Sequence, residues 1–106
     1  PSVSDQYGFQ YGAYCLMGAD AAYLRLMNLP ALDPAKLNDA KVIMNDLSVK
    51  YDFVYFYVED DGTPAVAMDL FVEPGSECAE TVFNTLIYML NVLDDAWQYI
   101  APYVAA

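Results

Sequence analysis

The hydrophobic pattern is clearest between residues 51 and 72, where apolar and aromatic side chains alternate with polar or small ones on both sides of Asp60-Asp61-Gly62. Alternation with a period of two is typical of half-buried strands, and Asp-Gly between two such runs is a strong hairpin signal. The stretch therefore predicts two antiparallel strands joined by a tight turn.

The length of this turn decides which side chains are buried, because a shift of one residue moves every side chain to the other face. A two-residue loop would place Val54 opposite Asp69 and mix polar and apolar groups. A three-residue loop, with Gly62 left-handed in a bulge, places Val54 opposite Met68. We prefer the three-residue loop because it gives one wholly apolar face, made of Val54, Phe56, Val58, Val66 and Met68.

The other face of the hairpin has aromatic side chains next to small ones, and it carries one acidic side chain. In the preferred register Tyr55 and Tyr57 lie against two alanines, and Phe53 lies beside Asp69. Tyrosine supplies a large contact area at a small cost in conformational entropy, so this face is suited to binding a partner. The predicted interaction surface consists of Phe53, Tyr55, Tyr57, Asp69 and Phe71.

The remaining segments predict a second hairpin and two helices. After an irregular start over residues 1–6, alternation over 7–17 and 21–29 predicts two strands with a turn between them. Asp33-Pro34 is a helix-start signal, and apolar residues spaced by three and four predict a helix over 34–47. Ser76 is expected to cap a helix over 77–100, whose apolar stripe is Ala79, Phe83, Leu86, Leu90, Leu93, Trp97 and Ile100.

The resulting order ββαββα predicts an α+β fold, with a four-stranded antiparallel sheet and both helices on one face. At 106 residues the chain forms one domain over 1–106. The other face of the sheet is left without a helix, and apolar residues flank the stripe of the last helix: Val82, Ile87, Met89 and Val92. This surplus predicts a twofold homodimer.

Composition narrows the range of partners. Fifteen acidic residues against four basic ones give a formal charge of −11, which disfavours nucleic acids and anionic membranes. Polar residues interrupt every apolar run well before the roughly 20 residues that a bilayer requires. Cys15 and Cys78 have no CxxC spacing, so two free and mostly buried thiols in the reducing cytoplasm are expected.

The sequence offers only weak candidates for catalytic or metal-binding residues. The chain has no histidine to activate a nucleophile, and the acids Glu59, Asp60 and Asp61 lack the alternating spacing of a calcium loop. Asp94 and Asp95 are adjacent on the predicted helix and point about 100° apart. We therefore expect no catalytic residue, no metal and no cofactor.

The second half of the chain resembles the YbjN-type domain, a group described as bacterial sensory transduction regulators. The resemblance covers about residues 30–100 and rests on Asn45, Asp61-Gly62, Asp69-Leu70 and Gly75, followed by a long helix. It implies a fold similar to that of type III secretion chaperones, small acidic dimers that bind protein segments, with no established catalytic residues. The family has a leading helix that is not expected here, so either that helix is missing from the chain or the resemblance is wrong.

Together these features predict a non-enzymatic protein-interaction module, chaperone-like or regulatory, that uses its aromatic sheet face. Two alternatives stay open. The first is a small-ligand-binding sensor domain with a tyrosine-lined concavity. The second is an acidic immunity protein or nucleic-acid mimic with a basic protein partner.

Overall fold

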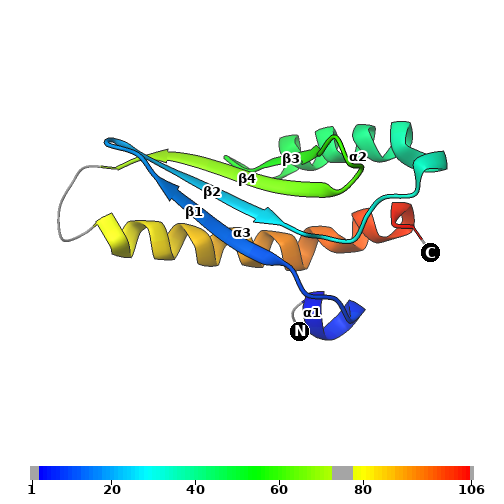
Figure 1. Cartoon of the computed structure of the whole chain (residues 1–106), viewed down its shortest axis with the longest axis horizontal. Coiled ribbons are helices and arrows are strands. Elements are labelled where there is room, and N and C mark those ends of the chain that lie inside the picture. The colour runs from blue at the N-terminus through cyan, green and yellow to red at the C-terminus, as the bar shows by residue number, and fades with distance from the viewer. Residues whose placement is uncertain (1–2, 73–77, 106) are drawn as a thin grey trace.

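Four antiparallel strands form one sheet with the order β1-β2-β4-β3 in the computed structural model, which describes residues 3–72 and 78–105 (Figure 1). Two long helices follow the two hairpins, so the predicted α+β order ββαββα is confirmed. A short helix precedes the first strand, and a 3-10 turn precedes each of α2 and the C-terminal tail. The bounds are α1 Val3–Tyr7, β1 Gly12–Met17, β2 Ala21–Met27, η1 Pro34–Lys36, α2 Leu37–Lys50, β3 Tyr55–Val58, β4 Pro64–Phe71, α3 Cys78–Ile100 and η2 Ala101–Tyr103.

Both long helices pack on the same face of the sheet, as predicted. The strand residues in the core alternate along the chain, with Leu24 and Leu26 on β2 and Val66 opposite Phe56 on the second hairpin. They pack with the buried stripes of α2 and α3, such as Met44, Leu47, Leu93 and Trp97, in a single cluster. Sheet and helices each have one apolar side, and this arrangement buries both sides together.

The second hairpin has the predicted three-residue loop. Phe56 lies opposite Val66, and the Glu59 amide donates to the Thr63 carbonyl at 2.8 Å, which leaves three residues in the turn. Gly62 has a φ of +85°, so its lack of a side chain is needed there. The Asp61 carboxylate accepts from the amide and the hydroxyl of Thr63, and these bonds lower its pKa.

The first strand begins five residues later than its alternation predicts, so that prediction is wrong for residues 7–11. Residues 3–7 form α1 instead of an irregular start, and Gly8, with a φ of +74°, ends this helix. The segment after Gly8 then crosses α3, where the ring of Phe9 lies 4.9 Å from that of Trp97. The alternation of aromatic residues in this segment therefore reflects packing on α3 and not a strand.

The helix α2 follows its sequence pattern closely. The Asp33 carboxylate accepts a hydrogen bond from the Ala35 amide at 2.9 Å, so the predicted cap is confirmed, although a 3-10 turn intervenes before α2. Ala40, Met44 and Leu47 are buried against the core. The cap predicted at Ser76 for the last helix lies outside the described residues.

The helix α3 buries the predicted stripe only in its second half, where Leu93, Trp97 and Ile100 are buried. Met89 and Val92, which the pattern placed beside the stripe, are buried, whereas Leu90 is only half-buried and Phe83 is 60% exposed. The second half of α3 contacts both α2 and the N-terminal segment, so a wider surface is buried there. The first half has no fully buried residue, and the predicted seam of six turns is therefore wrong at its beginning.

This correction predicts different effects for two adjacent substitutions. Met89→Ala should lower the free energy of unfolding by about 3 kcal/mol, because it leaves a cavity in a closed part of the core. Leu90→Ala should cost roughly 1 kcal/mol, since its side chain still contacts solvent. Urea unfolding monitored by circular dichroism measures both. If Leu90→Ala lowered the free energy of unfolding as much as Met89→Ala or more, the apolar stripe predicted from residue spacing would be the buried one.

The C-terminal tail is tied to the connection between β2 and α2. The Asp33 amide donates to the Tyr103 carbonyl at 2.8 Å, and the Ala105 amide donates to the Ala31 carbonyl at 2.9 Å. Leu32 and Val104 form an isolated antiparallel bridge between these bonds. Nothing in the local sequence pattern indicates this contact, because it joins segments more than 70 residues apart.

Candidate functional site

The face of the sheet that points away from α2 and α3 is the candidate site, and we call it the open face. Partners directly opposite each other in a sheet share a face, so the pairs Arg25 with Ala67 and Tyr55 with Ala67 place three strands in one row. Tyr14 on β1 pairs with Arg25 and extends the row. The side chains of the open face beyond its alanines are Tyr14, Leu16, Tyr23, Arg25, Met27, Tyr55, Tyr57, Asp69 and Phe71.

Large apolar and aromatic side chains on the open face are exposed to solvent. Phe71 is 91% exposed, Leu16 70% and Tyr55 62%, and Tyr14 and Tyr23 are also exposed. Ala65 and Ala67 are buried, because larger neighbours flank them on the central strand β4. Among the described residues no helix lies over this face, since α2 and α3 both pack on the opposite one.

Four of the five residues predicted for the interaction surface share the open face: Tyr55, Tyr57, Asp69 and Phe71. The prediction is wrong for Phe53. The strand β3 begins only at Tyr55, and Phe53 has a left-handed backbone with a φ of +68°, so it does not pair with Asp69. Phe53 instead lies with Met68 on the helix-bearing side of the sheet.

The polar groups of the open face form a small network around Arg25. Its guanidinium donates to the Asp69 carboxylate at 2.6 Å, so the acid on this face is paired with a base. Burial and the neighbouring Glu59 carboxylate raise the pKa of Tyr57, and Arg25 partly opposes this effect. Because both partners of the ion pair are partly exposed, it contributes little stability but neutralises charge on the face.

A hollow of about 560 Å³ lies on the sheet beside this network, lined by side chains of β1 and β2. Its lining residues are Tyr14, Cys15, Leu16, Tyr23, Arg25 and Met27. Ridges of tyrosine and leucine around a hollow over a sheet are suited to an extended polypeptide, whose alternate side chains point toward the sheet.

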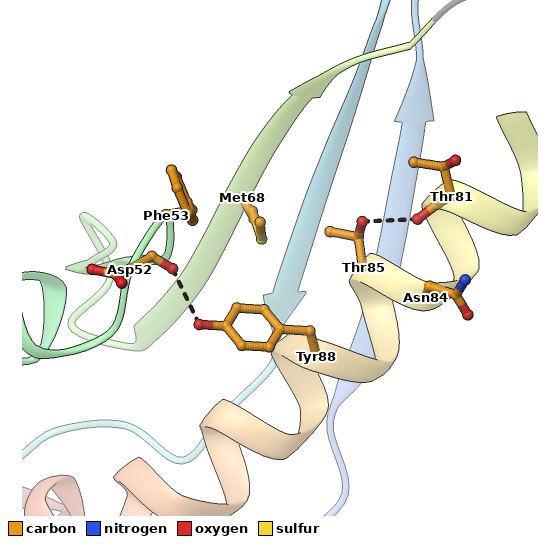
Figure 2. A pocket seen from close by; sticks show the side chains of 7 residues that line it. All are labelled: Asp52, Phe53, Met68, Thr81, Asn84, Thr85 and Tyr88. Atoms are coloured by element: carbon orange, nitrogen blue, oxygen red, sulfur yellow. Dashed lines mark hydrogen bonds between the residues drawn. The ribbon is translucent and has the colours of Figure 1, made fainter.

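A second hollow of about 560 Å³ opens between β4 and the first half of α3 (Figure 2). Phe53 and Met68 form its apolar wall, and the opposite wall carries the polar side chains Thr81, Asn84 and Thr85. Two of its hydroxyl groups are engaged within the protein, since Thr85 donates to the Thr81 carbonyl at 2.8 Å and Tyr88 to the Asp52 carbonyl at 3.3 Å. The described residues that line this hollow combine apolar, amide and hydroxyl groups with one acid, Asp52, and include no cationic group.

Two polar contacts between the end of α2 and α3 were not indicated by the sequence. The Tyr51 hydroxyl donates to the Asp95 carboxylate, and burial together with this bond raises the pKa of Tyr51. The Lys50 ammonium donates to the Tyr99 hydroxyl at 3.0 Å. Each contact joins α2 or its end to α3, so both have a structural role that requires the two helices to be packed together.

The cysteines are both free thiols, as expected, but the prediction that they are mostly buried is wrong. Cys15 is exposed on β1 and Cys78 is half-buried at the start of α3. In the described part of the chain, no three His, Cys, Asp or Glu side chains are grouped closely enough to hold a metal ion. Nor does any described helix have the length and apolarity to cross a membrane.

The missed half of the candidate site comes from the first hairpin. Alternation along residues 21–29 already puts Tyr23, Arg25 and Met27 on one side of a strand. What the sequence does not reveal is that β2 pairs with β4, which joins these residues to Tyr55 and Asp69 on one surface.

No protein-family model matches the chain, and neither a curated protein nor a solved structure matches it. The similarity to YbjN-type domains therefore stays a prediction drawn from the residues themselves.

Proposed function

We propose that the protein is a non-enzymatic, chaperone-like interaction module that binds extended segments of other proteins on its open face. One observation carries the proposal: Tyr14, Leu16, Tyr23, Tyr55 and Phe71 are exposed together on one face of a sheet. Contiguous exposed apolar surface is rare on monomers and usually marks a binding site. Tyrosine and phenylalanine are also enriched in protein interfaces.

The charge of the chain favours a partner with basic residues. The formal charge of −11 attracts cationic segments over long range and speeds their encounter with the protein. Arg25 is the one basic residue in the described open face, and Asp69 neutralises it. The preferred ligand is therefore an extended segment in which apolar residues alternate with lysine or arginine.

A peptide array tests the proposal. Twelve-residue peptides that alternate leucine or phenylalanine with lysine are expected to bind, and fluorescence anisotropy measures their affinity. The double variant Tyr55→Ser with Phe71→Ser should weaken binding about tenfold or more, as expected for aromatic hot spots. The matched control is Val42→Ser with Val49→Ser, which removes two exposed apolar side chains from α2.

Equal losses in the two double variants would show that binding is non-specific adsorption to apolar surface. Failure of every peptide to bind at millimolar concentration would reject the proposed function. Circular dichroism of both variants checks that the fold is retained, which is expected because all four side chains are exposed.

We also propose that the chain forms a twofold homodimer. Met89 and Val92, two of the residues from which the sequence pattern predicted a dimer, are buried within their own chain and cannot form the interface. The support now comes from the end of the molecule that holds the β1–β2 turn and the first half of α3 (Figure 1), where Leu16, Met17, Phe83 and Ile87 are exposed. Leu16 lies on the open face and α3 lies on the opposite side of the sheet, so apolar side chains are exposed on both sides of this end, which is suited to association.

A small-ligand sensor is the second candidate function, and the hollow in Figure 2 favours it. Its volume of about 560 Å³ lies in the range of ligand pockets, and it combines an apolar wall with threonine and asparagine groups. A thermal-shift series across neutral metabolites, repeated with Asn84→Leu, tests this candidate. A stabilising metabolite whose effect disappears in the variant would favour the sensor function.

Membership of the YbjN-type group and a cytoplasmic location complete the proposal. Two free thiols, one of them exposed, are compatible with a reducing compartment. An acidic immunity protein or nucleic-acid mimic would instead bind one folded basic protein tightly, and a nanomolar complex with such a protein, insensitive to the open-face variants, would replace the proposed function.

A further inference from the structure

The strand β1 leaves one of its two backbone edges unpaired in the described structure. It pairs with β2 alone, and the sheet ends there (Figure 1). The Gly18 amide donates to the Ala21 carbonyl at 2.8 Å, so by alternation the backbone groups of Leu16 and Tyr14 also point toward β2. The amides and carbonyls of Ala13, Cys15 and Met17 therefore point outward.

The opposite edge of the sheet is closed by α2. The Ser48 hydroxyl accepts from the outward-pointing amide of Phe56 at 2.9 Å and also lies 3.4 Å from the carbonyl of the same residue. A second strand cannot pair with β3 at this point without displacing Ser48. Of the two outer edges of the described sheet, the one at β1 is the accessible one.

The sequence of β1 contains none of the features that normally protect an edge strand. Its six residues, Gly-Ala-Tyr-Cys-Leu-Met, include no proline and no charge, and every residue from Ala13 onward is exposed. Edge strands usually carry lysine, proline or a bulge, because an unprotected edge pairs with other chains. Repulsion between two copies of a chain with a charge of −11 is weakest at an uncharged surface, and β1 carries no charged residue.

We infer that β1 is the interface of the homodimer, where it pairs antiparallel with β1 of a second copy and places Cys15 opposite the partner's Cys15. This inference rests on the proposed self-association. Pairing centred on Cys15 uses the outward backbone groups of Ala13, Cys15 and Met17. In this register Ala13 of each copy lies opposite Met17 of the other. A shift by one residue in either direction leaves one of the three without a strand partner.

The side chains favour the same register. On the helix-bearing side, small Ala13 faces large Met17, and two cysteines meet at the centre. On the open face, Tyr14 lies opposite the partner's Leu16, so both large side chains of this face have a large apolar neighbour across the interface. Centring on Tyr14 would instead oppose two tyrosines and leave Leu16 facing Gly12.

The dimer joins the two sheets into one and the two open faces into one surface. Directly opposite residues share a face, so the tyrosines and leucines of both copies lie on the same side. Each copy then presents Tyr14 and Leu16 at the centre of a surface twice as wide, with Tyr55 toward both ends. A longer extended segment could bind across both copies.

Oxidative crosslinking tests the interface, because the pairing brings the two Cys15 Cα atoms to about 5.5 Å, within disulfide range. In the Cys78→Ser variant, copper phenanthroline and air should convert most of the protein into a reducible dimer within minutes at tens of micromolar. The matched control, Cys15→Ser with Cys78 retained, should stay monomeric on a denaturing gel.

Mixed cysteine pairs test the register. With both native cysteines replaced by serine, Tyr14→Cys should crosslink to Leu16→Cys when the two proteins are mixed. Either variant alone should crosslink about tenfold less, since its two thiols then sit diagonally at about 7 Å or more. Efficient crosslinking of Tyr14→Cys to itself would overturn the register centred on Cys15.

Cys15→Pro tests the backbone contribution. Proline there removes an amide that points away from β2, a position that edge strands tolerate. Sedimentation should show a monomer with an unchanged far-ultraviolet spectrum, while Val49→Lys on α2 should stay dimeric. A monomer for the unmodified protein at all concentrations overturns the self-association itself, whereas a dimer without a Cys15 crosslink overturns the interface alone.

Discussion

Replacing Trp97 with alanine is expected to lower the free energy of unfolding by about 4 kcal/mol. Trp97 is 1% exposed and lies where α3, the core and the N-terminal segment meet. Its ring lies 4.9 Å from that of Phe9 and 6.4 Å from that of Tyr7. Truncation therefore leaves a cavity and also removes the surface on which the N-terminal segment packs.

Differential scanning calorimetry measures this effect as a fall in melting temperature of roughly 15–25 °C for a domain of this size. The matched variant Trp97→Phe retains an aromatic ring and should lose less than half as much free energy. Phe9→Ala, which removes only the covering side chain, should fall between the two. If Trp97→Ala cost under 1 kcal/mol, the packing of residues 7–9 on α3 would be wrong.

Phe56→Ala is expected to cost roughly 3–5 kcal/mol, whereas Tyr57→Ala should cost about 1 kcal/mol. The two residues are neighbours on β3, but Phe56 lies opposite Val66 in the core and Tyr57 lies opposite Ala65 on the open face. Phe56 also contacts the Tyr51 ring at 5.9 Å, so its loss affects the end of α2 as well. Chemical unfolding of both variants measures the difference.

This pair of variants tests the register of the second hairpin. A severe loss at Tyr57 with a mild one at Phe56 would mean that β3 is shifted by one residue relative to β4. Crosslinked or dimeric protein should be excluded by working at low micromolar concentration, because association would stabilise the folded state by mass action.

Most of the second hairpin could be predicted from its residues because local rules agree there. Asp61 and Gly62 favour the turn, and only one register places Val54, Phe56 and Val58 on the core side of the sheet. The same agreement holds for α2, where Asp33 supplies the cap and Ala40, Met44 and Leu47 form one stripe. In both places the local pattern and the tertiary environment favour the same structure.

The sequence-based predictions are wrong where contacts with a distant segment of the chain, and not the local pattern, determine the conformation. Residues 7–11 alternate like a strand, but the rings of Tyr7 and Phe9 pack on Trp97 of α3 instead, and Gly8 allows the bend. Phe53 continues the alternation of β3, yet the chain turns there to connect with α2. Local spacing contains no information about what packs against it.

The order of hydrophobic and polar residues determined by itself the element sequence ββαββα, the hairpin register and the pairing of a helix-bearing face with an aromatic one. Tertiary structure alone decided the strand order β1-β2-β4-β3, which brings Arg25 beside Asp69 and unites Tyr14, Tyr23 and Tyr55 on the open face. It also decided that Met89 and not Leu90 enters the core. The physical reason is that periodicity specifies which side of an element is apolar, whereas contacts between elements depend on shape and on the area that each arrangement buries.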